Sequence, residues 1–394
     1  MSVATRALPQ GSVIGLVGGG QLGRMTALAA RSLGYRVHVL DPDPQCPARG
    51  LCDRFVEGAL ADPKAARELG SGADVVTFDR EDMGGPSLAA LESLTALYPG
   101  QDVLQRVQDR GVQKNWLARN GFPVGPYYLA DDLAGLGEAL AQLGADARLK
   151  SRKGGFDGRS QWSAKGLSAQ ELWAQAGGVP LSVEQNLRLR AELSVMVARG
   201  VDGDISTFPV AYNIHERGAL EVSVMPAPLP PRLIQKALWV AHGVAERLGV
   251  VGLLAVEFFW TESGQLLINE LAARPHNTFH TTEWACVTSQ FEQLVRAICG
   301  LPLGSTAVLK PAAITNLFGD LWLAGREQAL VEMLRDPSVH LRLYDKAPRP
   351  HRKLGHLVYV SETPEQALAG AQALRGKLNA AIASPQAVPL GLVV

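Results

Sequence analysis

The chain has 394 residues, of which 47% are apolar and 19% are charged, and its formal net charge is zero. This composition describes an ordinary globular protein, and the length predicts several domains, each large enough to bury a core. A net charge of zero excludes a global electrostatic field, so we expect neither nucleic acid nor a membrane as a partner. The longest apolar stretch, residues 248–260, is interrupted by Glu257 and is too short to cross a bilayer.

The four cysteines, at positions 46, 52, 286 and 299, lack the C-x-x-C spacing that zinc sites and redox pairs use. We therefore predict reduced thiols and no zinc. The first twelve residues contain one arginine and no long apolar core, which argues against a secretory signal. Together these features predict a cytoplasmic protein.

A glycine-rich turn follows the first predicted strand, Val13–Val17. Residues 18–23 read G-G-G-Q-L-G, and the next apolar strand ends at Asp41. A β-α-β unit with G-x-G-x-x-G and an acidic residue after its second strand is typical of dinucleotide binding. Glycines at such a turn also permit tight helix packing or an anion at the helix N-terminus, so the motif alone is a weak signal. A dehydrogenase is the minority interpretation, because no candidate for hydride transfer follows.

Strands and helices continue through the next hundred residues, with a helix predicted over 105–120 and a strand over 147–150. Lys150 ends that strand, and residues 151–161 read S-R-K-G-G-F-D-G-R-S-Q. Backbone amides and cations of such a loop can wrap an oligophosphate, with Lys150 as a point charge. A flexible, solvated hairpin tip is the alternative interpretation of this loop.

Two further strands are predicted over 181–185 and 191–199. In the second, Glu192, Ser194 and Met196 alternate with apolar residues, so one face of the sheet is polar. A carboxylate on this face is suited to bind ribose hydroxyls.

A β-hairpin over 255–277 is the most informative segment, since apolar strands flank turn residues at 261–264. Pairing Trp260 with Leu267 places Glu257 directly opposite Glu270, on the same face of the sheet. Two facing carboxylates in apolar strands repel each other and lose hydration, so we expect a cation between them. Mg²⁺ with nucleotide phosphates fits best; the alternative is an edge hairpin with both glutamates in water.

The chain order of a basic strand, a basic glycine-rich loop, an acidic sheet and paired carboxylates resembles the ATP-grasp superfamily. Within it, the chain resembles the 5-(carboxyamino)imidazole ribonucleotide synthetase family over nearly its whole length. The motifs that carry this resemblance are G-G-Q-L-G-R-M at 19–25, G-G-F-D-G-R at 154–159, E-Q at 184–185, N-E-L-A at 269–272, R-P-H-N at 274–277, Y-D-K at 344–346 and R-P-H-R-K-L-G-H at 349–356.

The resemblance implies an α/β and α+β architecture, namely an ATP-grasp fold with an N-terminal Rossmann-like (pre-ATP-grasp) domain and a small C-terminal domain. The expected N-terminal domain is 1–108. The ATP-grasp small (lid) domain is expected over 109–190, the large domain over 191–310 and the C-terminal domain over 311–394. The resemblance also suggests a homodimer.

The resemblance further implies which residues surround each ligand. Glu257 and Glu270 are expected to hold Mg²⁺. The expected ATP-binding residues are Arg110, Lys150, Gly155, Phe156, Asp157, Gly158, Arg159, Ser160, Gln161, Glu184, Gln185, Asn186, Leu187, Glu192, His215, Asn269 and Glu270. The expected catalytic residues, which face bicarbonate and the aminoimidazole, are Arg274, His276, Asn277 and Asp157, with Asp157 at the substrate amine.

The basic run at 345–353 is a charged surface loop in its simplest interpretation. A nucleic-acid patch is disfavoured because no aromatic platform accompanies it. Its match to the family motif implies instead that Lys346, Arg352 and Lys353 bind the 5′-phosphate of the substrate.

The implied activity is ATP- and bicarbonate-dependent carboxylation of 5-aminoimidazole ribonucleotide, through carboxyphosphate, in purine biosynthesis. Such an enzyme is a carbon–nitrogen ligase. A sister ATP-grasp enzyme that uses formate and glycinamide ribonucleotide is a close alternative, and a nucleotide-binding regulator without turnover is a distant one. The chain departs from the family pattern at Phe156, Ser160, Ala273 and Thr278-Phe279, and reads F-D-R-E-D at 78–82 where the family has E-F-E-N. These departures concern fine substrate contacts rather than the nucleotide site.

Overall fold

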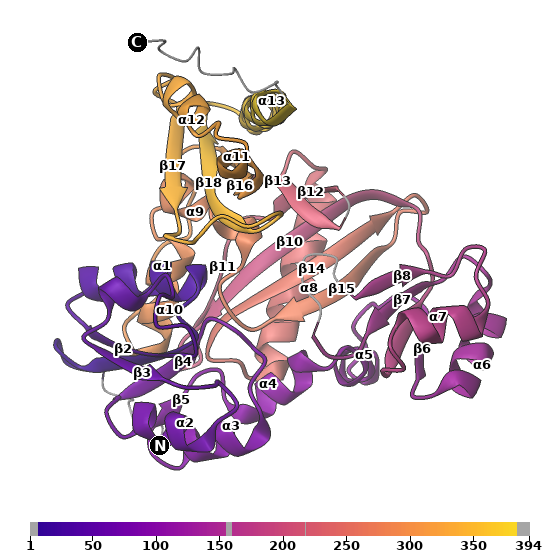
Figure 1. Cartoon of the computed structure of the whole chain (residues 1–394), viewed down its shortest axis with the longest axis horizontal. Coiled ribbons are helices and arrows are strands. Elements are labelled where there is room, and N and C mark those ends of the chain that lie inside the picture. Colours follow the sequence, from indigo (N-terminus) through magenta and orange to yellow (C-terminus); the bar gives the residue numbers. More distant parts are fainter. Residues whose placement is uncertain (1–6, 155–159, 217, 384–394) are drawn as a thin grey trace, which may run out of the picture.

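The computed structural model of the chain describes residues 7–154, 160–216 and 218–383. These residues form three sheets, two of which flank the third (Figure 1). No helix within these ranges is long and apolar enough to span a membrane. The four cysteines form no disulfide, as the sequence predicts.

The N-terminal sheet is parallel and has the strand order β3-β2-β1-β4-β5, so the order reverses beside β1. Its strands read as apolar runs because helices cover the sheet. The strands are β1 Val13–Val17, β2 Arg36–Asp41, β3 Arg54–Glu57, β4 Val75–Phe78 and β5 Ala96–Leu97. The helices are α1 Gln21–Ser32, α2 Pro63–Gly70, α3 Gly85–Glu92 and α4 Gln101–Gln108, with a 3₁₀ turn at Arg49–Leu51.

A small antiparallel sheet, at the right of Figure 1, has the order β6-β9-β7-β8. Two helices pack their apolar side chains on it to form a separate core. The elements are β6 Tyr127–Ala130, α6 Leu133–Leu143, β7 Arg148–Ser151, β8 Gln161–Ser163, α7 Ala169–Gln175 and β9 Leu181–Glu184. Helix α5, Arg110–Arg119, leads into this sheet from α4.

The largest sheet has the order β15-β14-β10-β12-β13-β16-β18-β17, and β11 pairs with β10. Its strands are β10 Leu189–Arg199, β11 Ile205–Thr207, β12 Ala211–Glu216, β13 Ala219–Met225, β14 Gly252–Thr261, β15 Leu266–Ala272, β16 Ala312–Phe318, β17 Val339–Leu343 and β18 Lys353–Val360. The strands that follow residue 311 thus extend the same sheet, through β16 paired with β13.

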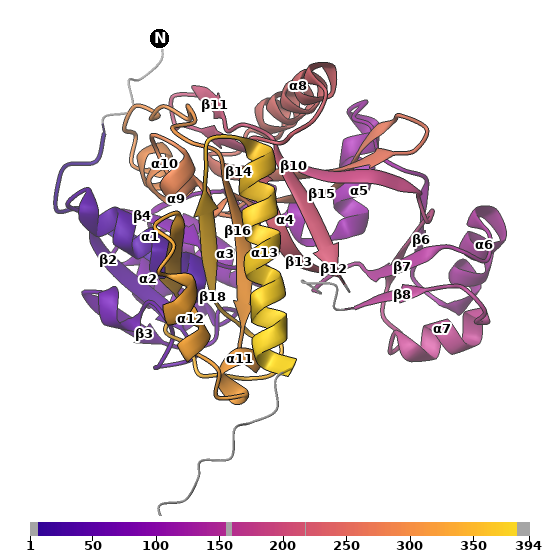
Figure 2. The same cartoon turned by 90° about the horizontal axis from the view of Figure 1, so that it is seen from above.

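Helices cover both faces of this sheet, and Figure 2 shows α13 lying along β16 and β18. The long helices are α8 Pro231–Leu248, α10 Gln290–Ile298 and α13 Pro364–Ala383. The shorter ones are a 3₁₀ turn Asn277–Phe279, α9 Thr282–Ala285, α11 Asp320–Leu323 and α12 Gln328–Met333. The family-based domain boundaries given above stay predictions.

The single helix predicted over 105–120 is wrong, because the chain breaks at Asp109 between α4 and α5. Asp109 has extended backbone angles, and its carboxylate accepts hydrogen bonds from the amides of Gly111 (2.8 Å) and Val112 (3.1 Å). The side chain of a capping aspartate bonds the first amides of the next helix, so it ends one helix and begins another. The spacing of apolar residues does not reveal such a break. The break places Arg110 at the first position of α5.

The predicted hairpin register is wrong at its tip, since Trp260 pairs with Leu266 rather than Leu267. A β-bulge between Phe258 and Glu257 restores the predicted pairing of Glu257 with Glu270. The extra residue in the bulge is Asn269. Bulges redirect side chains next to functional sites, and this one frees Asn269 from the regular alternation.

Candidate active site

The paired carboxylates lie on neighbouring strands, where β14 faces β15 (Figure 1). Burial and the negative charge of Glu270 raise the pKa of Glu257 to about 7. Glu270 Oε2 lies 3.3 Å from Arg110 Nη2, so one cation already approaches the pair. The sequence-based prediction of two facing carboxylates is confirmed.

His276 approaches Glu257 from the segment that follows β15, with 3.2 Å between His276 Nε2 and Glu257 Oε1. Burial, followed by the positive charges of Arg274 and Lys353, lowers the pKa of His276 well below its ordinary value. His276 is therefore neutral, so its contact with Glu257 is not an ion pair. Lys353 lies close enough to act on this histidine, which brings one C-terminal cation to the site.

Hydrogen bonds behind His276 select its tautomer. Thr278 Oγ1 lies 2.9 Å from His276 Nδ1, Ser194 Oγ donates to Thr278 Oγ1 at 3.0 Å, and Asn213 Nδ2 donates to Ser194 Oγ at 3.0 Å. The Thr278 hydroxyl, which accepts from Ser194, has one proton of its own to donate, and Nδ1 is within hydrogen-bond distance of it. We therefore assign the imidazole proton to Nε2, where it points at Glu257.

Lys150 lies in β7, and its side chain contacts Glu184 and Asn269, the residue before Glu270. Its Nζ donates to Glu184 Oε2 at 3.1 Å and to Asn269 Oδ1 at 3.0 Å, so the bulge residue holds this lysine. Lys114 Nζ reaches the same Glu184 oxygen at 3.3 Å. Burial raises the pKa of Glu184, but Lys150 and Lys114 outweigh it and lower the pKa to about 2. Glu184 is therefore a buried anion shared by two lysines.

Lys114 was not among the predicted site residues, and the structure shows that its side chain is only 4% exposed. Burial lowers its pKa, and the negative charge of Glu184 opposes that effect. A lysine inside a helical period reads as a solvated side chain, so the only sequence signal is its place four residues after Arg110. The two residues share a face of α5, which packs against β15.

Arg110 joins the glycine-rich loop to Glu270. Its Nη1 donates to the carbonyls of Ser151 (3.1 Å) and Gly154 (3.0 Å), while Nη2 faces Glu270. The predicted residues 155–159 lie outside the described residues. Ser160 has a φ of 60°, in the left-handed region that favours glycine, which explains why the family places glycine there.

The remaining predicted ATP residues lie at the junction of the small and largest sheets. His215 Nδ1 on β12 is 3.1 Å from Glu192 Oε2 on β10; burial lowers the pKa of His215, but Glu192 outweighs this and raises it. Residues 185–187 connect β9 to β10, and Gln161 pairs with Lys150 across β7 and β8. Asn186 Nδ2 donates to Asp146 Oδ2 at 3.1 Å, and this exposed hydrogen bond involves no other predicted site residue.

The predicted substrate side gathers after β15. Both polar atoms of the Asn277 carboxamide are buried and have no hydrogen-bond partner among the described residues. Arg274 Nε lies 3.9 Å from Glu81 Oε1, which accepts a hydrogen bond from the Ala273 amide at 2.6 Å. Glu81 is a contact that the sequence prediction did not assign. Its only signal was the departure at 78–82.

The C-terminal basic loop meets the glycine-rich turn of the N-terminal domain. Lys346 Nζ donates to Gln21 Oε1, and Arg24 Nη1 lies 3.6 Å from Asp345 Oδ2. Arg352 donates to Ala347 O of its own loop at 3.1 Å.

That glycine-rich turn is filled by the chain itself. Asp41 Oδ2 accepts from the Gly19 amide at 2.7 Å, and a Cβ on Gly20 would lie 2.2 Å from Asp79 Oδ2. Two carboxylates occupy the place that a dinucleotide takes in the dehydrogenase interpretation, which is therefore unsupported here.

Three family models match successive parts of the chain. Residues 12–108 match the ribonucleotide synthetase preATP-grasp domain, 115–291 the ATP-grasp domain, and 312–370 the phosphoribosylaminoimidazole carboxylase C-terminal domain. The N5-carboxyaminoimidazole ribonucleotide synthase of Bacillus subtilis is 39% identical over 365 residues, which cover 90% of this chain and 93% of that protein. The chain belongs to the N5-carboxyaminoimidazole ribonucleotide synthase family.

Other members of this synthase family agree. The Brucella melitensis synthase is 36% identical over 90% of this chain and 98% of its own. A crystal structure of a synthetase with ADP has a TM-score of 0.89 at 39% identity, covering 94% of this chain and 98% of that one. The Aspergillus clavatus synthase in complex with ADP and 5-aminoimidazole ribonucleotide has a TM-score of 0.86 at 28% identity, covering 94% and 99%. These likenesses confirm the ATP-grasp fold with its flanking preATP-grasp and C-terminal domains.

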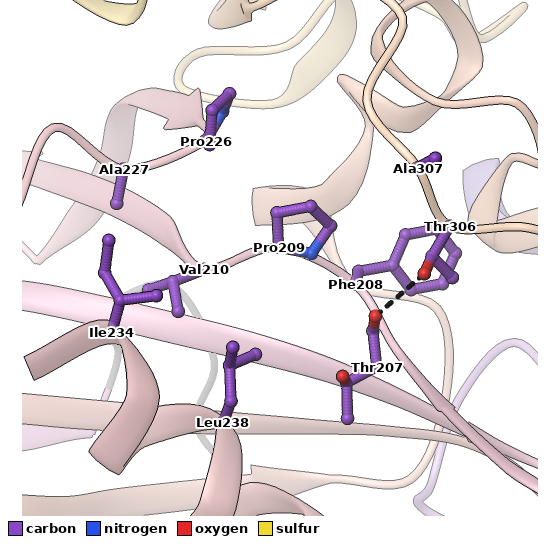
Figure 3. Close-up of a pocket in the computed structure, with 10 residues that line it drawn as sticks. All are labelled: Thr207, Phe208, Pro209, Val210, Pro226, Ala227, Ile234, Leu238, Thr306 and Ala307. Atoms are coloured by element: carbon purple, nitrogen blue, oxygen red, sulfur yellow. Dashed lines mark hydrogen bonds between the residues drawn. The ribbon is translucent and has the colours of Figure 1, made fainter. Parts of the chain in front are cut away.

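An apolar pocket of about 300 Å³ lies apart from this synthase site, between the β11–β12 segment and α8 (Figure 3). Its lining includes Phe208, Pro226 and Leu238, and no titratable side chain. It holds none of the predicted site residues.

Proposed function

We propose that the chain carboxylates 5-aminoimidazole ribonucleotide to 5-(carboxyamino)imidazole ribonucleotide, using ATP and bicarbonate, in purine biosynthesis. The observation that carries this proposal is the convergence of Glu257, Glu270 and Lys150 with His276 and the unpartnered Asn277. The carboxylates and the lysine fit a metal–nucleotide complex. The neutral imidazole of His276 and the carboxamide of Asn277 belong to the segment that the family resemblance assigns to the aminoimidazole.

The donor set at Glu257 and Glu270 fits Mg²⁺. No cluster of three or more potential metal-ligating side chains occurs in the part of the chain that the structure describes. Two carboxylates are what Mg²⁺ commonly takes from a protein, since water and phosphates supply its other ligands. Burial and, after it, the negative charge of Glu270 raise the pKa of Glu257, and a cation between the two carboxylates would offset that repulsion. When bound, Mg²⁺ supplies neutralisation of phosphate charge.

Lys150 and Arg110 are the residues that place positive charge beside the ATP phosphates. Attack of bicarbonate on the γ-phosphorus forms carboxyphosphate and releases ADP. Such a transfer depends chiefly on the placement of charge around the phosphoryl oxygens. Asn269 and Glu184 fix the Lys150 ammonium in two directions, so its position is set before the substrate arrives.

Carboxyphosphate then breaks down to CO₂ and phosphate, and the exocyclic amine of the ribonucleotide attacks CO₂ and loses a proton. Arg274 stabilises the anionic intermediate, while His276 and Asn277 orient the aminoimidazole. The assignment of Asp157 to the amine stays a prediction. Lys346, Arg352 and Lys353 bind the 5′-phosphate, and the influence of Lys353 on the pKa of His276 supports its place near the substrate.

The experiment that tests this function is ADP release from Mg-ATP and bicarbonate, with and without 5-aminoimidazole ribonucleotide. Strong stimulation by the ribonucleotide is the expected result. Stimulation by glycinamide ribonucleotide with formate instead would transfer the chain to the sister activity. Absence of ADP release under both conditions would contradict the enzyme assignment and leave a nucleotide-binding protein.

The assembly that we propose is a homodimer in the cytoplasm. Its support is the family resemblance. Sedimentation equilibrium of the full chain checks the first point, since a single species at 42.0 kDa would contradict a dimer. Fractionation of the source cells checks the cytoplasmic location.

A further inference from the structure

Among the described residues, three buried glutamines each bind both backbone groups of one distant residue. Gln113 accepts from the Leu271 amide at 3.0 Å and donates to its carbonyl at 3.2 Å. Gln290 accepts from the His276 amide at 2.8 Å and donates to its carbonyl at 3.0 Å. Gln293 binds Gly304 in the same way, at 2.8 and 2.9 Å. None of the three side chains exceeds 2% exposure.

A carboxamide offers a donor and an acceptor side by side, as the backbone of a neighbouring strand does. Leu271 lies in β15, which is an edge strand of the largest sheet as described. On its outer side the chain pairs with it at Ile268, through Pro123 and Val124. Three residues after Ile268, at Leu271, the carboxamide of Gln113 makes the hydrogen bonds that a neighbouring strand would make. Leu271 directly follows Glu270.

Two of these glutamines bracket the segment that carries the site. Gln113 holds the residue after Glu270, and Gln290 holds His276 itself. Between them Glu81 accepts from the Ala273 amide, so side chains from three other segments of the chain hold the backbone from Leu271 to His276. The third glutamine, Gln293, holds a loop that contributes none of the predicted site residues.

Neither bracketing carboxamide is available to a ligand. The amide nitrogen of Gln113 also donates to Val107 O at 3.2 Å. The amide nitrogen of Gln290 also lies 3.0 Å from His280 Nδ1, and His280 is fully buried. Their polar atoms are spent on the protein, so any effect on the reaction passes through the segment they hold.

We propose that Gln113 and Gln290 are positioning residues, which hold residues 270–277 in the geometry that the metal and the acceptor require. This inference rests on the proposed function. Gln113 aims Glu270 at the cation, and Gln290 aims His276 and the adjacent Asn277 at the ribonucleotide. Outer residues that orient ligating groups commonly change metal affinity when they are replaced.

The test compares Gln113→Met, Gln290→Met and Gln293→Met in the full chain. Methionine keeps the length of the side chain and removes its hydrogen bonds. Calorimetric titration of Mg²⁺ in the presence of ADP measures metal binding without turnover. We expect Gln113→Met to weaken Mg²⁺ binding about tenfold, and Gln290→Met to weaken ribonucleotide binding by a similar factor. Gln293→Met should leave both affinities unchanged while losing comparable thermal stability.

Unchanged Mg²⁺ affinity in Gln113→Met would overturn the inference and leave the proposed function intact. Equal losses in Gln293→Met would overturn it too, since the effect would then be general destabilisation. If the calorimetric titration shows no Mg²⁺ binding to the wild-type chain in the presence of ADP, the proposed metal site is contradicted. Hydrogen exchange then tests the positioning role directly. Faster exchange of the Leu271 amide in Gln113→Met and of the His276 amide in Gln290→Met supports that role. Unchanged exchange at both amides overturns it. Gln113→Asn, one methylene shorter, replaces Gln113→Met if that variant does not fold.

Discussion

His276 Nε2 lies 3.2 Å from Glu257 Oε1, yet the histidine is neutral because burial and neighbouring cations lower its pKa. This contact therefore does not cancel the charge of the Glu257 carboxylate. That uncancelled charge lies opposite Glu270, so burial and electrostatic repulsion raise the pKa of Glu257 to about 7. A proton and a cation consequently compete for the same oxygen atoms near neutral pH.

This competition predicts that Mg²⁺ binding strengthens as the pH rises through about 7, where Glu257 loses its proton. Below that pH the apparent affinity should fall about tenfold per pH unit. The folded carboxyl holds its proton more tightly than the unfolded one, at 4.5, so the metal-free protein loses stability as the pH rises from about 4.5 to about 7. Calorimetric titrations and denaturant unfolding across this window check both trends. Glu257→Gln should abolish them, and their persistence in that variant would assign them to another group.

Glu270→Gln should lower ATP turnover by at least about a hundredfold while the protein stays folded, because the amide removes a charge that Mg²⁺ requires. Steady-state ADP release measures the loss, and far-ultraviolet circular dichroism checks the fold. Glu262→Gln is the matched control, since Glu262 is an exposed carboxylate in the turn of the same hairpin. Full activity in Glu270→Gln would refute the metal assignment.

Lys114→Met should destabilise the protein by about 3 kcal/mol, because it leaves the buried Glu184 with one lysine instead of two. The KM for ATP should also rise, since Glu184 holds Lys150. Glu184 has its pKa lowered to about 2, so its contribution is present above its ordinary pKa of 4.5 and is lost as the pH falls toward 2. Urea unfolding at neutral and acidic pH measures the difference from wild type. The exposed Lys165→Met should change neither quantity, and equal losses in both variants would contradict this explanation.

The sequence was sufficient to predict the pairing of Glu257 with Glu270, although it did not reveal the bulge at Asn269. The predicted register gives the right pair because the bulge shifts the pairing by one residue between the tip of the hairpin and Glu257. Lys150 was predictable for a related reason, since it ends a strand beside a glycine-rich loop. Both inferences depend on residues that are close together in the sequence, so a single sequence is enough to make them.

Contacts made by α5 could not be predicted in this way. Gln113 binds Leu271 across 158 positions of sequence, and the two meet only because α5 packs along the edge of β15. The capping of α5 by Asp109 sets which of its residues face that edge, and apolar periodicity missed the cap. Glu81 reaches Ala273 across 192 positions for a similar reason, because the N-terminal sheet ends beside the site. Positioning residues of this kind follow from packing, not from a motif.

Thr278 provides the final prediction, because its hydroxyl links Ser194 to His276 and selects the imidazole tautomer. Thr278→Val keeps the shape of the side chain but leaves the Ser194 hydroxyl without its acceptor and His276 Nδ1 without its donor. Unpaired buried polar groups cost about 1–3 kcal/mol each, so we expect lower stability and a fall in kcat of about tenfold or more. Thr278→Ser retains the hydroxyl and should restore both, consistent with the serine that the family places here. Steady-state kinetics and the ¹⁵N shifts of the His276 ring nitrogens measure the outcome. An unchanged Nε2–H tautomer in Thr278→Val would show that Glu257 alone determines the position of the proton.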